Sequence, residues 1–159
     1  MFLVDDTRKE RSEKIRSLID SDLSLAALSA VLDFEWTLRR CILALGKSPT
    51  MTIRMEILDK ATFKDYTRIW NEEVYPSVKI KLKDLLPDFK INDKHIFTLR
   101  NRIFQGELEA YGFVKFHYTK LDVEMILSAS EKLTKFAEEK NKPIYDRRII
   151  RNKKNMRNL

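Results

Sequence analysis

The chain has 159 residues, of which 43% are hydrophobic, and it contains only 3 glycines and 4 prolines. This composition excludes a disordered chain, and it favours one helical domain with its own core over a many-stranded β fold. No apolar run reaches the roughly 18 residues that a membrane span needs, and a single cysteine excludes an internal disulfide. The net charge of +7 is concentrated near the C-terminus. We therefore expect an all-α, cytoplasmic protein without a secretory signal or membrane contact.

Two helices are predicted in the first third of the chain. The first begins near residue 6, with Asp5 or Asp6 as N-cap, and its apolar stripe consists of Ile15, Leu18 and Ile19. The second is the long apolar segment that Gly46 ends. One stripe of this second helix is formed by Leu25, Leu28, Leu32 and Trp36. Since its other faces are also apolar, it is either the central helix of a bundle or part of a subunit interface.

Shorter helical segments follow. Residues 51–61 and 62–75 are predicted to form two of them, the second ended by Pro76. Residues 77–86 alternate as a strand would, but the lysines between the apolar positions favour a short helix. A further helix covers residues 92–106, with Asn92 or Asp93 as its cap.

The last long helix is predicted to begin at Thr119, where Asp122 completes an approximate capping box, and to end at Pro143. Its apolar face would consist of Leu121, Met125, Ala129, Leu133 and Phe136. Together these elements predict a bundle of four to five main helices that forms one domain over residues 1–142.

Residues 143–159 form a basic C-terminal tail. Its last 13 residues, RRIIRNKKNMRNL, hold six of the 31 basic residues and no acid, so 25 basic residues face 24 acidic ones elsewhere. One interpretation is an arm that binds RNA without sequence preference through Arg147, Arg148, Arg151, Lys153 and Lys154. The other is a solvated chain end.

Common enzyme motifs are absent from the sequence. It contains no metal-ligand spacing, no phosphate-binding glycine loop and no glycine-flanked nucleophilic serine, so we expect neither a metal nor a cofactor. Cys41, on the apolar second helix, is expected to be a packing residue. His95 and His117 are interpreted as a surface and a loop histidine.

The stretch LRNRIFQG, residues 99–106, is the strongest candidate site. On a helix Asn101 and Gln105 share one face, and the long side chain of Arg100 can reach the same patch. Arg102 points away from this patch and is a further candidate cation for RNA. Two guanidinium groups and two amides on one short helix indicate an anion site.

This stretch resembles the signature helix of the HEPN superfamily (higher eukaryotes and prokaryotes nucleotide-binding), in which an arginine, a polar residue and three further residues precede a histidine, often followed by glycine. The stretch DFEWTLRRCILAL, residues 33–45, resembles the second helix of bacterial HEPN proteins, and the resemblance covers about residues 10–140. It implies a helical bundle that dimerises, brings two such motifs into one cleft and cuts RNA without metal, leaving a cyclic phosphate. It also implies that Arg100 holds the phosphate beside Asn101, with Glu35 of the second helix as their polar partner. The alternative for Glu35 is an exposed pair with Arg39.

The chain departs from this pattern at the position of the histidine, which is Gln105. An amide cannot act as general acid or base, a role that contributes about 10²–10⁴-fold to such reactions. One hypothesis is a metal-independent endoribonuclease of a toxin or defence system, inactive or weakened by a natural or deliberate change at residue 105. The second is a non-catalytic module that binds RNA or a nucleotide, or acts as a dimeric regulator. The third is a helix with an ordinary charged face. The expected partners are RNA, a second copy of the chain and an antitoxin or other defence-system protein.

Overall fold

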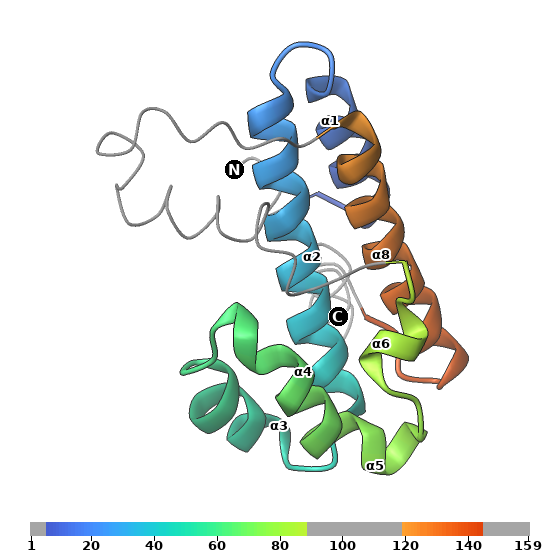
Figure 1. Cartoon of the computed structure of the whole chain (residues 1–159). Coiled ribbons are helices and arrows are strands. Elements are labelled where there is room, and N and C mark those ends of the chain that lie inside the picture. The colour runs from blue at the N-terminus through green and yellow to red at the C-terminus, as the bar shows by residue number, and fades with distance from the viewer. Residues whose placement is uncertain (1–5, 89–118, 145–159) are drawn as a thin grey trace, which may run out of the picture.

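In the computed structural model of the protein, residues 6–88 and 119–144 are described, and all their regular elements are helical. The three long helices are α1 (Arg8–Leu18), α2 (Leu23–Leu45) and α8 (Lys120–Glu139). Helix α2 runs through the centre of the molecule, with α1 and α8 packed along it and the short elements gathered around its C-terminal half (Figure 1). The all-α prediction is confirmed for these residues, and α2 is the central helix.

Thr7 caps helix α1, in place of the predicted Asp5 or Asp6. The Thr7 backbone N–H donates to Glu10 Oε2 at 2.7 Å, and the Glu10 N–H donates to Thr7 Oγ1 at 3.3 Å, which forms a complete capping box. Asp6 is instead held by Lys14, whose Nζ lies 2.8 Å from Oδ2. The predicted stripe is confirmed, since Ile15 is buried and the other two members, Leu18 and Ile19, pack against the core.

Asp22 caps the N-terminus of α2, where its carboxylate accepts a hydrogen bond from the Leu25 N–H at 3.0 Å. Gly46 follows the last helical residue, as predicted. Its backbone is extended there (φ −62°), so it is not required for a left-handed turn. A Cβ at Gly46 would lie 2.8 Å from the Ile42 carbonyl oxygen and would collide with the Ile53 side chain. Close approach of the next segment therefore explains this glycine.

The predicted stripe of α2 is not its most buried face. Leu25 is 42% exposed, and the other three members are half-buried. The fully buried side chains lie on the faces toward α1, α8 and the segment 63–74, and they are Ala26, Ala27, Ala30, Val31, Phe34, Leu38, Cys41 and Ile42. Because α2 is apolar nearly all round, the positions of its neighbours decide which face is covered.

Residues 50–85 form a series of short helices: α3 (Thr50–Thr52), the π-helix η1 (Ile53–Leu58), the 3₁₀-helix η2 (Phe63–Asp65), α4 (Tyr66–Ile69), the π-helix η3 (Trp70–Val74), α5 (Tyr75–Val78) and α6 (Leu82–Leu85). The prediction that Pro76 ends a helix was wrong, because Pro76 lies in the first turn of α5. Helix α5 follows the π-helix η3 without a break, so the helical run that begins at Tyr66 continues through Pro76 at the change from π-helical to α-helical hydrogen bonding. The helix ends at Val78, before Lys79 adopts a left-handed conformation (φ 59°).

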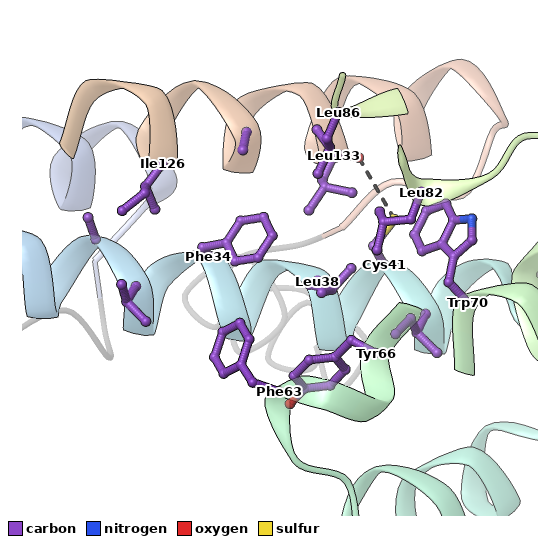
Figure 2. Packing of buried hydrophobic residues seen from close by; sticks show 14 of the residues in the cluster. Phe34, Leu38, Cys41, Phe63, Tyr66, Trp70, Leu82, Leu86, Ile126 and Leu133 are labelled. Atoms are coloured by element: carbon purple, nitrogen blue, oxygen red, sulfur yellow. Dashed lines mark hydrogen bonds between the residues drawn. The ribbon is translucent and has the colours of Figure 1, made fainter. Parts of the chain in front are cut away.

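Figure 2 shows the core between α2, α8 and the short helices. The Phe63 and Tyr66 rings meet edge to face with centroids 5.4 Å apart, and the Trp70 Nε1–H donates to the Ile80 carbonyl at 2.9 Å. Cys41 is fully buried, and its thiol lies 3.9 Å from the Leu133 carbonyl oxygen. Burial raises the pKa of Cys41 to about 12, which keeps the thiol protonated and confirms its packing role.

Helix α8 begins with the predicted capping box, in which the Thr119 N–H donates to Asp122 Oδ2 at 2.6 Å. Its buried face differs from the predicted one at Leu121, which is 69% exposed, whereas Val123, Ile126 and Leu127 are buried. The helix also ends before Pro143: its last residue is Glu139, and Asn141 takes a left-handed conformation (φ 56°).

Candidate functional site

Glu35 is the predicted site residue that falls within residues 6–88 and 119–144. The candidate anion site lies outside these ranges, as do the candidate RNA-binding residues of the tail: Arg100, Asn101, Arg102, Gln105, Arg147, Arg148, Arg151, Lys153 and Lys154. Within the described ranges, the candidate site therefore consists of Glu35 and the side chains that contact it.

Glu35 lies on the middle of α2, and its side chain is buried, with 7% of the residue exposed. Its Oε1 accepts a hydrogen bond of 2.8 Å from the Tyr66 hydroxyl, on α4. The same hydroxyl oxygen accepts a hydrogen bond of 3.3 Å from Arg39 Nη1, one turn further along α2. The alternative of an exposed Glu35–Arg39 pair was therefore wrong about exposure, and the phenol group connects the two residues.

The Tyr66 hydroxyl stays protonated in this environment. Burial raises the pKa of Tyr66 far above its usual value, and the negative charge of Glu35 raises it further, against a smaller opposite effect of Arg39. A protonated phenol can donate to Glu35 and accept from Arg39 at the same time. Tyr66 thus fixes the carboxylate of Glu35 from an element that lies 31 residues away in sequence.

Arg39 extends this cluster toward the surface. Its Nη2 donates to the Leu58 carbonyl at 3.0 Å and lies 3.8 Å from Asp59 Oδ1. Leu58 is the last residue of η1, so Arg39 links α2 to the end of a π-helix. We call Glu35, Tyr66 and Arg39 the α2–α4 cluster.

A second buried carboxylate, Asp33, lies two residues before Glu35 but contacts other partners. Its Oδ1 accepts a hydrogen bond of 2.7 Å from Arg11 Nε, on α1, and both side chains are almost fully buried. The nearby Ser130 hydroxyl favours the charged form of Asp33. Neither the Ser130 hydroxyl nor Asp33 Oδ2 has a hydrogen-bond partner among the described residues. Burial raises the pKa of Asp33, and Arg11 offsets that effect only in part.

Trp36, next to Glu35 on α2, contacts two arginines, one of which is the partner of Asp33. The guanidinium carbon of Arg11 lies 4.4 Å from the Trp36 ring centroid, and that of Arg40 lies 4.5 Å from it. Both distances are within the range of cation–π attraction. These contacts fix two arginines against one ring on the half-buried face of α2.

The described ranges contain no group of three histidine, cysteine or acidic side chains that could hold a metal ion. Within the same ranges, no helix is both long and apolar enough to cross a membrane. Comparison of the chain with protein-family models, with curated proteins and with solved structures gives no match. A functional interpretation therefore depends on the residues themselves.

Sequence reasoning named Glu35 as a candidate, but it did not foresee Tyr66 as the hydrogen-bond partner of Glu35. The resemblance indicated an acid on the second helix, whereas the phenol that fixes it comes from a distant segment. Only the tertiary packing of α4 against α2 brings the two together, so no local pattern in the sequence predicts this contact.

Proposed function

We propose that this protein is a HEPN-like RNA-binding domain, a metal-independent endoribonuclease of a toxin or defence system whose cleavage is lost or weakened. The observation that carries this proposal is the pattern of Arg100, Asn101, Gln105 and Gly106 in LRNRIFQG, together with Glu35 in DFEWTLRR. The proposed site contains the groups needed to hold a phosphate and lacks the group needed to move a proton.

The chemistry explains why a single residue decides the activity. In RNA cleavage of this type the 2′-hydroxyl attacks the neighbouring phosphorus, and the 5′-oxygen leaves. Arg100 would stabilise the additional negative charge on the phosphate in the transition state. A histidine at position 105 would transfer the proton near neutral pH, whereas the amide of Gln105 can only form hydrogen bonds.

The described part of the chain supports the proposal in two ways. It is all-helical, as a HEPN-like domain requires, and α2 carries a fixed acid at the expected position. The Tyr66 hydroxyl restricts the Glu35 side chain to one orientation, which is how a polar partner in a catalytic cleft is held.

The test is the variant Gln105→His, assayed on single-stranded RNA in EDTA. We expect this variant to produce fragments with 2′,3′-cyclic phosphate ends, because the missing imidazole is supplied. Arg100→Ala on the same background should abolish cleavage, since the transition-state charge loses its partner. Wild-type protein and the single Arg100→Ala variant serve as matched controls for a contaminating nuclease.

A folded Gln105→His protein that cuts no RNA would exclude the latent nuclease. The second candidate function, a non-catalytic RNA-binding or dimeric regulatory module, is favoured by the amide at residue 105, which can bind a phosphate oxygen but cannot transfer a proton. That function requires RNA affinity in the wild type, weakened by Arg100→Ala. It also requires a homodimer, with a mass near twice 18.9 kDa in analytical ultracentrifugation.

A further inference from the structure

A pocket of about 510 Å³ lies beside the C-terminal half of α2. Its charged and polar lining comes from three segments: α2, the start of α3 with η1, and the turn after η1. These charged, polar and aromatic lining residues are Trp36, Arg39, Arg40, Thr50, Arg54 and Asp59. The volume is within the range of small-molecule sites, about 300–1,000 Å³.

The lining carries an excess of positive charge, since three guanidinium groups face one carboxylate. The carboxylate of Asp59 lies 3.8 Å from Arg39 Nη2 and so offsets mainly that arginine. The guanidinium of Arg54 has no hydrogen-bond or ion-pair partner among the residues that the structure describes. A concave site with this balance attracts anions.

Two of the arginines are held in place before any ligand arrives. Arg39 donates to the Leu58 carbonyl and to the Tyr66 hydroxyl, and Arg40 lies against the Trp36 ring. An arginine that is already ordered loses less conformational entropy when it binds an anion. Arg54 lies on η1, and π-helical turns often mark functional positions.

The chemistry of the lining indicates which anion fits. Guanidinium groups bind phosphate oxygens in pairs, and the Thr50 hydroxyl can donate a further hydrogen bond. The remaining wall is aliphatic, with Leu43, Ala44 and Leu58. Two guanidinium groups already lie over the Trp36 ring, so the ring is less available for stacking on an aromatic base, and the lining favours phosphate.

Pro143 and Ile144, the first residues of the tail, are part of the pocket lining, but the charged remainder of the tail does not suit the pocket. Residues 145–159 carry six basic side chains and one acidic one, Asp146, so their charge has the same sign as the lining. We propose that the pocket is a binding site for a small molecule with two or more linked phosphate groups. None of the lining residues belongs to LRNRIFQG, so the pocket does not depend on the proposed nuclease site.

Isothermal titration calorimetry on the full chain tests the proposal with four probes: inorganic pyrophosphate, a nucleoside 5′-diphosphate, its parent nucleoside and a short single-stranded RNA. We expect the two diphosphates to bind and the parent nucleoside not to bind. Equal binding of nucleoside and diphosphate overturns the proposal. The proposal is also overturned if RNA is the only probe that binds and Arg54→Gln abolishes that binding, because the ligand class is then wrong.

Substitutions at three exposed residues make the test specific for this pocket. Arg54→Gln should weaken diphosphate binding at least about tenfold, since a charged hydrogen bond is lost. Asp59→Asn should strengthen it, by up to about fivefold, since a competing negative charge is removed. Arg68→Gln removes the same charge from a residue that pairs with Asp65 and Glu72 outside the pocket, and should leave affinity unchanged. If Arg68→Gln weakens binding as much as Arg54→Gln, the effect is general charge and the pocket is not the site.

Discussion

Helix α2 carries two buried acids two residues apart, and they contact opposite surroundings. Asp33, near α1 and α8, forms a closed ion pair with Arg11 in which both side chains are at most 5% exposed. Glu35, near α4, is connected through Tyr66 to Arg39, which is half-exposed and lines the pocket. The first acid holds helices together, whereas the second belongs to a cluster that reaches solvent. Burial alone therefore does not distinguish these two acids, whereas their partners do.

Of the substitutions around the two acids, replacement of Arg11 should cause the largest loss of unfolding free energy. Arg11→Ala leaves the carboxylate of Asp33 buried without its cation, which should cost about 3–5 kcal/mol of unfolding free energy. Urea unfolding followed by circular dichroism measures this loss. The matched control is Arg16→Ala, on the same helix, whose pair with Glu124 is exposed and should contribute only about 0–1 kcal/mol. Equal effects of the two substitutions would contradict a special role for the Asp33 pair.

The loss caused by Arg11→Ala should also depend on pH. The pKa of Asp33 is raised in the folded protein, so the folded state binds a proton more readily than the unfolded state. Its ionised form therefore costs stability above the folded pKa, and this cost disappears as the pH falls through that pKa. Arg11 lowers the pKa of Asp33, so this pKa should be higher still in the variant without Arg11. Protonation of Asp33 should therefore restore more stability in the variant than in wild type. The difference in unfolding free energy between wild type and variant should become smaller as the pH falls from about 7 to about 4.

Local sequence patterns predicted the long helices but not the segment between them. Asp122 and Gly46 act through neighbours a few residues away, so the capping box of α8 and the end of α2 could be foreseen. The π-helical turns of η1 and η3 could not, because packing of their side chains against α2 and α8 determines that hydrogen-bond register. The exposure of Leu121 has the same origin, since the positions of α1 and α2 decide which face of α8 is covered.

A smaller effect is expected for Tyr66→Phe. This change keeps the ring in the core but removes the hydroxyl that donates to Glu35 and accepts from Arg39. Leaving a buried carboxylate without this donor should cost about 1–3 kcal/mol. Tyr75→Phe is the control, because Tyr75 is half-buried and its hydroxyl has no hydrogen bond among the described residues. The urea midpoint of this control variant should stay near that of wild type. Similar midpoints for both variants would mean that the cluster contributes nothing to folding.

The candidate site was foreseen only where residue type and spacing carry the information. Glu35 was named as a candidate because the resemblance implies a polar partner on the second helix. Its burial was not foreseen, because the spacing to Arg39 is also that of a common surface pair. The pocket was missed for a related reason: Arg40 and Arg54 are 14 positions apart, and only the packing of η1 beside α2 brings them to one cavity.

The smallest stability effect, and the sharpest test of function, is expected for Glu35→Gln. The amide oxygen can still accept from Tyr66, so unfolding free energy should change by less than about 1 kcal/mol. On the Gln105→His background, the same change should lower the RNA cleavage rate while RNA affinity stays constant or rises, because a negative charge near the phosphate is removed. Glu73→Gln is the matched control, since Glu73 is equally buried and accepts hydrogen bonds from Ser48, away from α2–α4 cluster residues. If Glu35→Gln and Glu73→Gln leave cleavage equally unaffected, Glu35 is a second structural acid, and the contrast with Asp33 is one of packing alone.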